Sequence, residues 1–435
     1  MLRAEENERV TRTGPGTPLG EVMRRYWVPA LLSAELPEPD CPPVRVGLLG
    51  EQLIAFRDSE GRVGLLDQRC PHRGASLFFG RNEECGIRCI FHGWKFDVDG
   101  NCTDLPNEPD DSKMKDKVKA TAYPTAEAGG VVWAYLGPKE KMPPLEKQEW
   151  MTLPEGHFYC TKNQADANWL QMLEGGFDSS HSSFLHRQLK WAEGEAGTKT
   201  QVFRARSTAP RHEVDANDYG CSYASLRALP DGEDNYVRVT QFVMPFHQLR
   251  PFEGKYERPL ISGHIWVPID DTHCWVYSWM QAKDGGPLDR EFIEAEERDA
   301  GRSPEFFIPG TFRFKQNKDN DYLIDREAQR TESFTGITGI STQDQAAQES
   351  MGPIADRTFE HLGTADLAIV RIRQLLLKAC RDLEEGSDPL GSQAALVPVR
   401  PAEKVVPKDE DWRSALAGDL EMPGTEKAGE LAAAK

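Results

Sequence analysis

Short apolar runs separated by turn residues dominate the first third of the chain. Residues 53–56 and 63–66 are two such runs, and they flank the turn sequence at 58–61, which predicts a β-hairpin. The fully apolar run 131–136 is closed by a Gly-Pro pair and is typical of a buried strand. This pattern predicts a small all-β domain over residues 26–140, preceded by an N-terminal arm at 1–25.

The pattern changes after this domain. Prolines and charges over residues 141–158 predict a linker. Apolar positions at helical spacing then predict a helix over residues 165–173, and the pair Gly175-Gly176 is expected to break it. Farther along, strand-like runs between residues 201 and 279 predict an antiparallel sheet.

A long amphipathic helix is predicted over residues 366–383, because its leucines, valines and isoleucines recur at helical spacing. Residues 159–384 therefore form a second domain, with an antiparallel sheet and a long helix near its C-terminal end. Residues 385–435 are rich in proline, glycine, alanine and charges and predict a flexible tail. The fold class is α+β, with an all-β domain followed by a mixed domain.

Composition narrows the possible partners. A chain of 435 residues is long enough for two cores, and 39% hydrophobic residues is ordinary for a globular protein. A net charge of −18 argues against nucleic acid or an anionic membrane as the partner. No run approaches the roughly 20 apolar residues of a membrane helix. Nine scattered cysteines predict reduced thiols in a cytoplasmic protein.

Two Cys-His pairs carry the first chemical signal. Cys70 and His72 form a C-x-H pair, and Cys89 and His92 form a C-x2-H pair. Two thiolates that hold one iron and two imidazoles that hold the other make a Rieske [2Fe-2S] cluster. A zinc site is the alternative, but zinc sites usually place a cysteine pair in one turn and a histidine pair in another. The spacing therefore favours the iron–sulfur cluster.

A second constellation, D-x2-H-x4-H, follows the predicted helix at Asp178, His181 and His186. Two histidines and one carboxylate on one side of an open site make the facial triad of non-haem Fe(II) oxygenases. Helix geometry puts Asp178 and His181 on one face, whereas His186 reaches the same metal only if the segment bends. The alternative is a pair of histidines on a solvated helix. An upstream electron carrier favours the metal site, because the electrons need an acceptor.

In this order the two motifs resemble the catalytic subunits of Rieske non-haem iron ring-hydroxylating oxygenases, over roughly residues 20 to 380. Ala75 and Phe91 stand where respiratory Rieske proteins carry an extra cysteine pair, which favours the oxygenase branch. The resemblance implies a helix-grip catalytic domain that binds Fe(II). It also implies that His181 and His186 are iron ligands. Asp178 is then the acidic residue that bridges the iron to His92 of a neighbouring subunit's cluster.

The third iron ligand lies farther along the chain. Resemblance to the acidic segment of the family favours Asp344, and Asp356 is the competing choice. Glu174 and Asn168 stand where the family often has polar residues that support the ligands, although both fit equally well as ordinary polar positions of a helix.

Three further segments, at residues 26–29, 321–326 and 348–357, resemble the phthalate dioxygenase branch. The resemblance implies a homo-oligomer of catalytic subunits, either a trimer or a hexamer of stacked trimers. It also implies a separate NAD(P)H-dependent reductase with FMN and a plant-type ferredoxin centre. The chain itself has no glycine-rich dinucleotide motif and no further ferredoxin cysteine cluster.

The same branch implies O2-dependent dihydroxylation of a small aromatic carboxylate, such as a phthalate or benzoate. O- or N-demethylation by a Rieske monooxygenase is the alternative within the family. A Rieske electron carrier without oxygenase activity and a zinc-stabilised binding module are the alternatives outside it. A carboxylate substrate calls for a buried arginine. Arg204, Arg206 and Arg238 lie in the predicted sheet, and Arg238 is the favoured one, although an arginine between valines is often on a solvated face.

Overall fold

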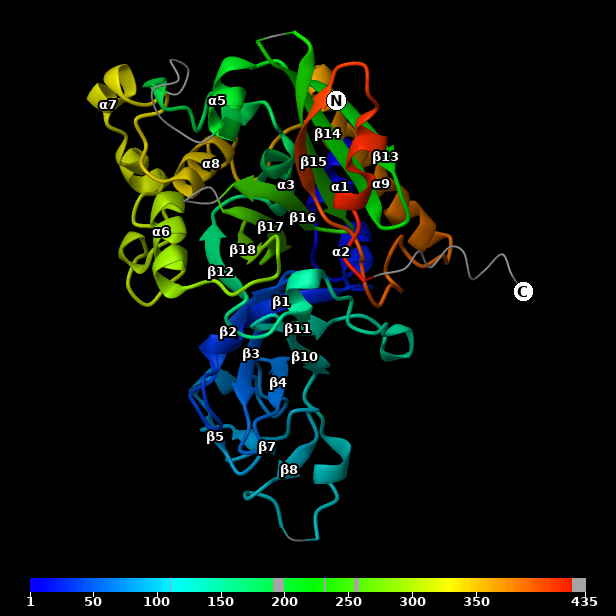
Figure 1. Cartoon of the computed structure of the whole chain (residues 1–435). Helices are drawn as coiled ribbons and strands as arrows, with labels where there is room; N and C mark the ends of the chain where they lie inside the picture. Colours follow the sequence, from blue (N-terminus) through cyan, green and yellow to red (C-terminus); the bar gives the residue numbers. More distant parts are fainter. Residues whose placement is uncertain (110, 191–198, 231, 254–257, 425–435) are drawn as a thin grey trace.

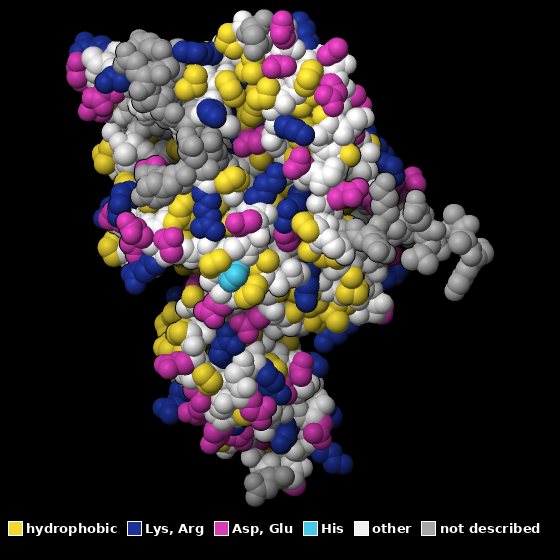
Figure 2. Space-filling model, in the orientation of Figure 1, with side chains coloured by type: hydrophobic (Ala, Val, Ile, Leu, Met, Phe, Trp, Pro, Cys, Tyr) yellow, Lys and Arg dark blue, Asp and Glu magenta, His cyan; other side chains and the backbone are white. Residues whose placement is uncertain are grey.

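The structure is a computed structural model that describes residues 1–109, 111–190, 199–230, 232–253 and 258–424. Figure 1 shows a slender β domain below and a larger mixed domain above. On the face in Figure 2, acidic and basic side chains are interspersed over both domains. None of the helices in the described ranges is long and apolar enough to cross a membrane.

The lower domain is built from three small antiparallel sheets. The predicted hairpin of residues 53–66 is confirmed, since β3 and β4 pair in register. The sheets comprise β1 (Trp27–Leu32), β11 (Val131–Tyr135) and β10 (Thr125–Ala128); β2 (Val44–Leu48), β3 (Glu51–Arg57), β4 (Val63–Asp67) and β9 (Ala122–Tyr123); and β5 (Arg81–Glu83), β6 (Gly86–Arg88), β7 (Lys95–Phe96) and β8 (Cys102–Asp104). The predicted all-β domain is therefore confirmed.

The upper domain is built on one antiparallel sheet with the order β12-β18-β17-β16-β15-β14-β13. Its strands are β12 (Phe158–Ala165), β13 (Arg211–Ala216), β14 (Gly220–Ala228), β15 (Asp234–Val243), β16 (His247–Glu253), β17 (Pro259–Pro268), β18 (Cys274–Ala282) and β19 (Ala402–Pro407). One edge of β15 is shared: residues 241–243 pair with β16, and residues 234–239 pair with β19. Strand β16 therefore turns away from β15 beyond Leu249 and widens the sheet there.

Helices pack on the sheet, and two of them, α1 and α2, form the N-terminal arm. They are α1 (Ala4–Thr11), α2 (Pro18–Met23), α3 (Trp169–Phe177), α5 (Lys199–Arg206), α6 (Arg290–Ala300), α7 (Arg326–Thr331), α8 (Ile340–Glu349), α9 (Leu367–Glu384) and α10 (Trp412–Leu416). Helix α9 confirms the predicted long helix. Its apolar face contacts β13 and β14, and α1 and α2 pack against it as well. The N-terminal arm is thus docked on the upper domain.

Short 3-10 helices complete the described secondary structure. They lie at Ser33–Glu35, Leu77–Phe79, Lys115–Lys117, Lys139–Lys141, Glu149–Thr152, His181–Ser183, Pro304–Phe306, Lys318–Leu323, Thr364–Asp366 and Ala417–Asp419. The turn at His181–Ser183 matters most, because it carries a predicted metal ligand.

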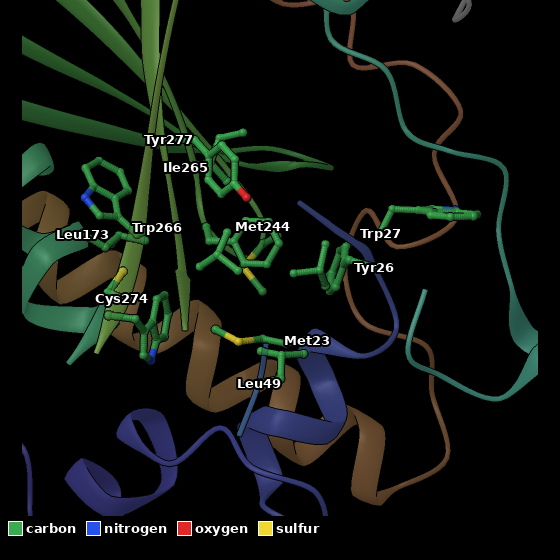
Figure 3. Packing of buried hydrophobic residues seen from close by; sticks show 14 of the residues in the cluster. Met23, Tyr26, Trp27, Leu49, Leu173, Met244, Ile265, Trp266, Cys274 and Tyr277 are labelled. Atoms are coloured by element: carbon green, nitrogen blue, oxygen red, sulfur yellow. The ribbon is translucent and has the colours of Figure 1, made fainter. Parts of the chain in front are cut away.

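One continuous apolar core joins the two domains. Figure 3 shows Met23 and Tyr26 near Met244, in the turn after β15, and the same cluster contains Ile265 and Tyr277 of the large sheet and Leu49 of the lower domain. The segment predicted as a linker also belongs to this core, since Trp150 is fully buried and stacks on Trp279 with ring centroids 5.2 Å apart. Burial of this much apolar surface fixes the orientation of the domains.

Helix α3 differs from its prediction at both ends. It begins at Trp169, because the side-chain oxygen of Asn168 accepts a hydrogen bond from the N–H of Leu170 and caps the helix. It also continues through the glycine pair to Phe177. A Cβ on Gly175 would lie 1.8 Å from Gln348 Nε2, and one on Gly176 would lie 2.2 Å from the Trp266 ring. The glycines therefore permit close packing instead of breaking the helix.

Two other predictions are wrong. Residues 199–206 form helix α5 instead of a strand, in keeping with a sequence of mostly straight-chain residues and alanine. The tail is not irregular over residues 402–416, because β19 pairs with β15 and α10 packs beside it. Ala402, Val406 and Trp412 are buried there. The end of the predicted tail, 425–435, lies outside the described residues.

Candidate metal centres

The two Cys-His loops have the same backbone turn. The N–H of Gly74 donates to the carbonyl of Cys70, and the N–H of Gly93 donates to the carbonyl of Cys89. Both glycines have a positive φ, 75° and 78°, which suits glycine because it has no Cβ. Each loop therefore closes four residues after its cysteine and carries its histidine on the turn.

The loops bring together the four residues predicted to hold a cluster. Cys70 and Cys89 are each 2% exposed, and a thiol–thiol interaction links them. The rings of His72 and His92 lie 4.5 Å apart, and His72 stacks on Trp94. His92 Nδ1 is buried without a hydrogen-bond partner in the described residues. Two neighbouring imidazoles, one of them with a buried nitrogen that has no partner, and two adjoining thiols are the donor set of a Rieske [2Fe-2S] cluster.

Three predicted ligands meet in the upper domain, on the turn after α3 and on α8. His181 Nε2 and His186 Nε2 lie 3.2 Å apart. Asp344 Oδ1 lies 3.3 Å from His186 Nε2 and 3.6 Å from His181 Nε2. Ligand atoms about 2.1 Å from one ion, at right angles, are about 3 Å apart. These three atoms fit one iron with a free side.

The bend that His186 requires is present. Helix α3 ends at Phe177, and His181 lies on the next 3-10 turn, so His181 and His186 do not share one regular α-helix. Although burial opposes ionisation, His186 and His181 lower the pKa of Asp344 to about 2. Asp344 is therefore a carboxylate, as a metal ligand must be.

A neighbouring glutamine orients His186. Its Nδ1 donates to Gln343 Oε1 at 2.8 Å, and Gln343 Nε2 donates in turn to the carbonyl of Ile337. Because the amide oxygen only accepts, the proton lies on Nδ1 of His186, and Nε2 keeps its lone pair for a metal. Gln343 gave no signal in the sequence beyond its position next to Asp344.

Asp178 occupies the C-terminal cap of α3, next to the ligand candidate His181. Its Oδ1 accepts hydrogen bonds from the N–H groups of Ser180 and His181. Its Oδ2 lies 3.9 Å from His181 Nδ1, which is buried without a hydrogen-bond partner in the described residues. The Asp178 side chain is 30% exposed. Asp178 therefore lies beside His181 and is also accessible from outside.

The other acidic candidates have different surroundings. Asp356 is exposed and accepts hydrogen bonds from Thr358, and it is not in the group formed by the two histidines and Asp344. Glu174 is buried in ion pairs with Arg357 and Arg373, at 2.9 and 2.6 Å. Asn168 caps α3 and also donates to the carbonyls of Thr11 and Asp271. Glu174 and Asn168 therefore hold α3 in place and do not line the cavity.

A cavity of about 530 Å³ opens beside the three iron-ligand candidates. Most of its sheet wall comes from even-numbered residues, because alternate side chains of a strand share a face. They are Arg238, Thr240, Gln248, Arg250, Phe252, Ser262, His264, Trp266, Val276, Ser278 and Met280. The volume lies within the range of small-molecule sites.

Three of the arginines that line the cavity, two from the sheet and Arg302 from the segment after α6, differ in their partners. Arg238 is 8% exposed, and its guanidinium lies 3.8 Å from Glu403 of β19. Arg302 is paired with Glu297. Arg250 has no ion pair with a described residue, and its Nε is buried without a hydrogen-bond partner. Burial, together with Arg238, Arg302 and Arg204, lowers the pKa of Arg250 to about 9.

The sequence prediction for these arginines was partly wrong. Arg238, the favoured candidate, is buried and lines the cavity from β15, which excludes the solvated-face alternative. Arg204 also lines the cavity, but from helix α5, and Arg206 on the same helix is exposed. Arg250 was missed, although its even-numbered position on an alternating strand was the available signal.

Comparison with known proteins identifies the family. Residues 26–123 match the Rieske [2Fe-2S] domain, and residues 134–432 match the "LigXa C-terminal domain like" family. The chain is 40% identical to the phthalate 4,5-dioxygenase oxygenase subunit of Pseudomonas putida, over 95% of this chain and 94% of the relative. The chain belongs to the Rieske non-haem iron oxygenases. The predicted family is confirmed.

A second relative of this Rieske oxygenase is the 3-chlorobenzoate-3,4-dioxygenase oxygenase subunit of Comamonas testosteroni, 38% identical over 97% of this chain and 99% of the relative. Among solved structures, NdmA of Pseudomonas putida CBB5 is similar, with a TM-score of 0.58 and 18% identity over 91% of this chain and 100% of that chain. That likeness shows the fold alone.

The family's cofactors are a [2Fe-2S] cluster and a mononuclear iron, and the residues of both centres fit them. When bound, the cluster supplies one-electron transfer and the iron supplies activation of O2. As the oxygenase subunit of a multicomponent system, the chain works with a separate reductase and with O2.

Proposed function

We propose that this chain is the terminal oxygenase that dihydroxylates a small aromatic carboxylate. Electrons come from NAD(P)H through the separate reductase. In this proposal Cys70, His72, Cys89 and His92 hold the [2Fe-2S] cluster. His181, His186 and Asp344 hold the iron, and Asp356 has no ligand role. The reaction consumes one O2, two electrons and two protons for each ring, and both oxygen atoms stay in the product.

We infer the substrate class from the surroundings of Arg250. A guanidinium in a cavity, with a buried Nε and no carboxylate partner among the described residues, is stabilised by an anion. A substrate carboxylate would form a bidentate pair with it. Met172, Phe252 and Trp266 supply apolar surface for an aromatic ring in the same cavity. Two relatives, named as phthalate and chlorobenzoate dioxygenase subunits, support this substrate class.

The role proposed for each residue follows from its contacts. Arg250 holds the carboxylate and thereby sets the distance between the ring and the iron ligands. Gln343 keeps the lone pair of His186 aimed at the metal. Asp178 lies beside His181 Nδ1 and there accepts or returns a proton as charge arrives at the iron centre. The buried walls of the cavity limit access of water to the ring.

The separation of the two centres within one subunit supports a homo-oligomer. In Figure 1 the strands β5 and β7, which flank the cluster loops, lie at the far end of the molecule from α3 and α8. Ile90 and Phe91 beside the cluster are 62% and 54% exposed. Phe184, between the two iron-ligand histidines, is 42% exposed. We infer that His92 of one subunit meets Asp178 of the next in a trimer, or in a hexamer of stacked trimers.

The remaining partners follow from this proposal. The reductase carries FMN and a plant-type ferredoxin centre, which would deliver single electrons to the cluster loops. All nine cysteines are described and none forms a disulfide, which supports a reducing, cytoplasmic location.

The experiment is a panel of aromatic acids incubated with the iron-loaded protein, NADH and a reductase of this type, with products analysed by mass. We expect at least one acid to gain two oxygens and two hydrogens, and Arg250→Gln to raise its KM far more than that of a neutral analogue. Formaldehyde release would instead show demethylation. Protein without mononuclear iron by metal analysis would indicate a carrier, and a colourless protein would indicate a zinc module.

A further inference from the structure

His264 is the only histidine among the cavity-lining residues of the sheet. It lies on β17 directly opposite Gln248 of β16, and both side chains face the cavity. His264 is not part of the group that places two histidines and Asp344 around one ion. Its two ring nitrogens have different surroundings, and that difference determines what the residue offers to a ligand.

A chain of hydrogen bonds fixes the proton on His264. Gln248 Nε2 donates to the backbone carbonyl of Gly176, and this carbonyl can only accept. The orientation of the amide is therefore set, with Oε1 on the opposite side. His264 Nδ1 lies 3.2 Å from Gln248 Oε1 and must donate to it. The ring proton is therefore on Nδ1.

The other nitrogen faces the cavity without a partner. His264 Nε2 has no hydrogen bond with any residue of the described ranges, although the residue lines the cavity. Burial, then Arg250 and Arg302, hold the pKa of His264 well below its usual range, and Asp344 only partly opposes them. The ring is neutral, so Nε2 presents a lone pair and no proton.

We propose that His264 is a specificity-determining residue whose Nε2 accepts a hydrogen bond from a hydroxyl or amino group on the substrate ring. This inference rests on the proposed function, because Arg250 takes the carboxylate of the same molecule. Arg250 and Gln248 are two residues apart on β16 and share a face, and Gln248 pairs with His264 on β17. The cation of Arg250 and the acceptor of His264 are therefore neighbours on the cavity wall. The preferred substrates are hydroxy- or amino-substituted aromatic acids.

The alternative direction of the bond is disfavoured by the same contacts. A substrate methoxy or carbonyl oxygen would need a proton on Nε2, which requires an imidazolium beside Arg250. A methoxy group in place of the hydroxyl would leave two lone pairs facing each other. The pocket therefore discriminates between a donor and an acceptor of similar size.

Binding of probe acids to the iron-loaded protein without O2, followed by calorimetry, tests this. The probes are benzoate, the three hydroxybenzoates and the three matching methoxybenzoates. We expect one hydroxybenzoate to bind about tenfold more tightly than benzoate and than its methoxy counterpart, in line with one hydrogen bond. His264→Leu should remove this preference and leave benzoate within about twofold, whereas His264→Gln, which retains an acceptor, should keep part of it.

A second variant reverses the preference. Glutamate at position 248 would favour an imidazolium, so Gln248→Glu should weaken the hydroxybenzoate and strengthen the methoxybenzoate. If that variant does not fold, the wild-type and His264→Leu series still decides. Equal affinities for all hydroxy and methoxy pairs in the wild type would overturn the proposal, and so would a His264→Leu variant that weakens all acids equally. If none of these acids binds, the carboxylate substrate class itself fails, which is a separate outcome.

Discussion

The two metal centres of this chain use similar residues but are assembled in different ways. The cluster loops lie within one short stretch, and each is closed by its own backbone hydrogen bond. The iron site joins a turn after α3 to Asp344 on α8, and each segment depends on distant partners for its position. The first centre is a local structure at the tip of a small domain, and the second is a product of the whole upper domain.

This difference matches the two tasks. An electron-transfer centre has to lie near a surface that other proteins can reach, and the exposed Ile90 and Phe91 beside His92 provide one. A centre that activates O2 has to exclude water and to fix a substrate, which requires a buried cavity. We therefore expect changes at the cluster loops to stay local, whereas changes near the iron should spread through its supporting contacts.

The largest expected effect is that of Asp344→Ala. Without this carboxylate the two histidines alone hold the iron, so we expect the mononuclear iron and product formation to be lost. The visible spectrum of the [2Fe-2S] cluster should stay unchanged, because its loops lie in the lower domain, whereas α8 lies in the upper one. Metal analysis and absorption spectroscopy measure both. Asp356→Ala, at the competing exposed carboxylate, is the matched control and should keep its iron. The reverse result would exchange the two assignments.

Asp178→Asn tests whether the two centres communicate through this carboxylate. Asparagine keeps an oxygen that can accept from the N–H groups of Ser180 and His181, so the turn should persist. We expect both metals to remain bound and product formation to fall by about a thousandfold, or about 4 kcal/mol in barrier height. Rapid mixing of the reduced protein with substrate and O2 would show whether cluster oxidation is slowed. Product formation at the wild-type rate would contradict the proposed bridge.

The sequence predicted the cluster site more completely than the iron site, because the first is local in the chain and the second is not. Cys70, His72, Cys89 and His92 are readable because the ligands of a local loop have a fixed spacing. Asp344 came from resemblance, since nothing in its neighbours states that α8 will meet the turn at His181. Arg250 and the Gln248–His264 pair were missed, because a strand pattern shows which residues share a face but not which face surrounds the cavity. Gln343 was missed because it lies on α8, and its contact with His186 arises only when α8 meets the turn after α3.

The fold was predicted best where the hydrophobic pattern was regular or extended over many residues. The hairpin at residues 53–66 and helix α9 are examples. Helix α3 was placed four residues too early, at 165–173 instead of Trp169–Phe177. Its end was misplaced because Gly175 and Gly176 were interpreted as helix breakers, whereas tight packing against Gln348 and Trp266 requires them. Strand β19 was missed because its partner β15 lies far away in the sequence, and local composition carries no record of that pairing.

Glu174→Gln tests the dependence of the iron site on distant contacts. The substitution removes a buried negative charge between Arg357 and Arg373, so both guanidinium groups lose the Glu174 carboxylate as an ion-pair partner. We expect the free energy of unfolding of the upper domain to fall by about 3 kcal/mol. Chemical denaturation followed by tryptophan fluorescence measures this change. Glu294→Gln on the exposed face of α6 is the control and should have almost no effect. An equally small effect at Glu174 would show that α3 is held by its apolar contacts.

Gln343→Leu should have the smallest effect and is the finest test of the comparison. Leucine has a similar size but cannot accept the Nδ1 proton of His186, so the ring loses its orientation while all three ligands remain. Outer contacts of this kind are worth about 10- to 100-fold in metal affinity. We expect iron affinity, measured by competition with a chelator, to fall within that range while the stability of the domain barely changes. Gln343→Glu retains an acceptor and should bind iron at least as tightly as the wild type. Unchanged affinity in the leucine variant would mean that the turn after α3 positions His186 without help, and only Asp344 would then tie the site to α8.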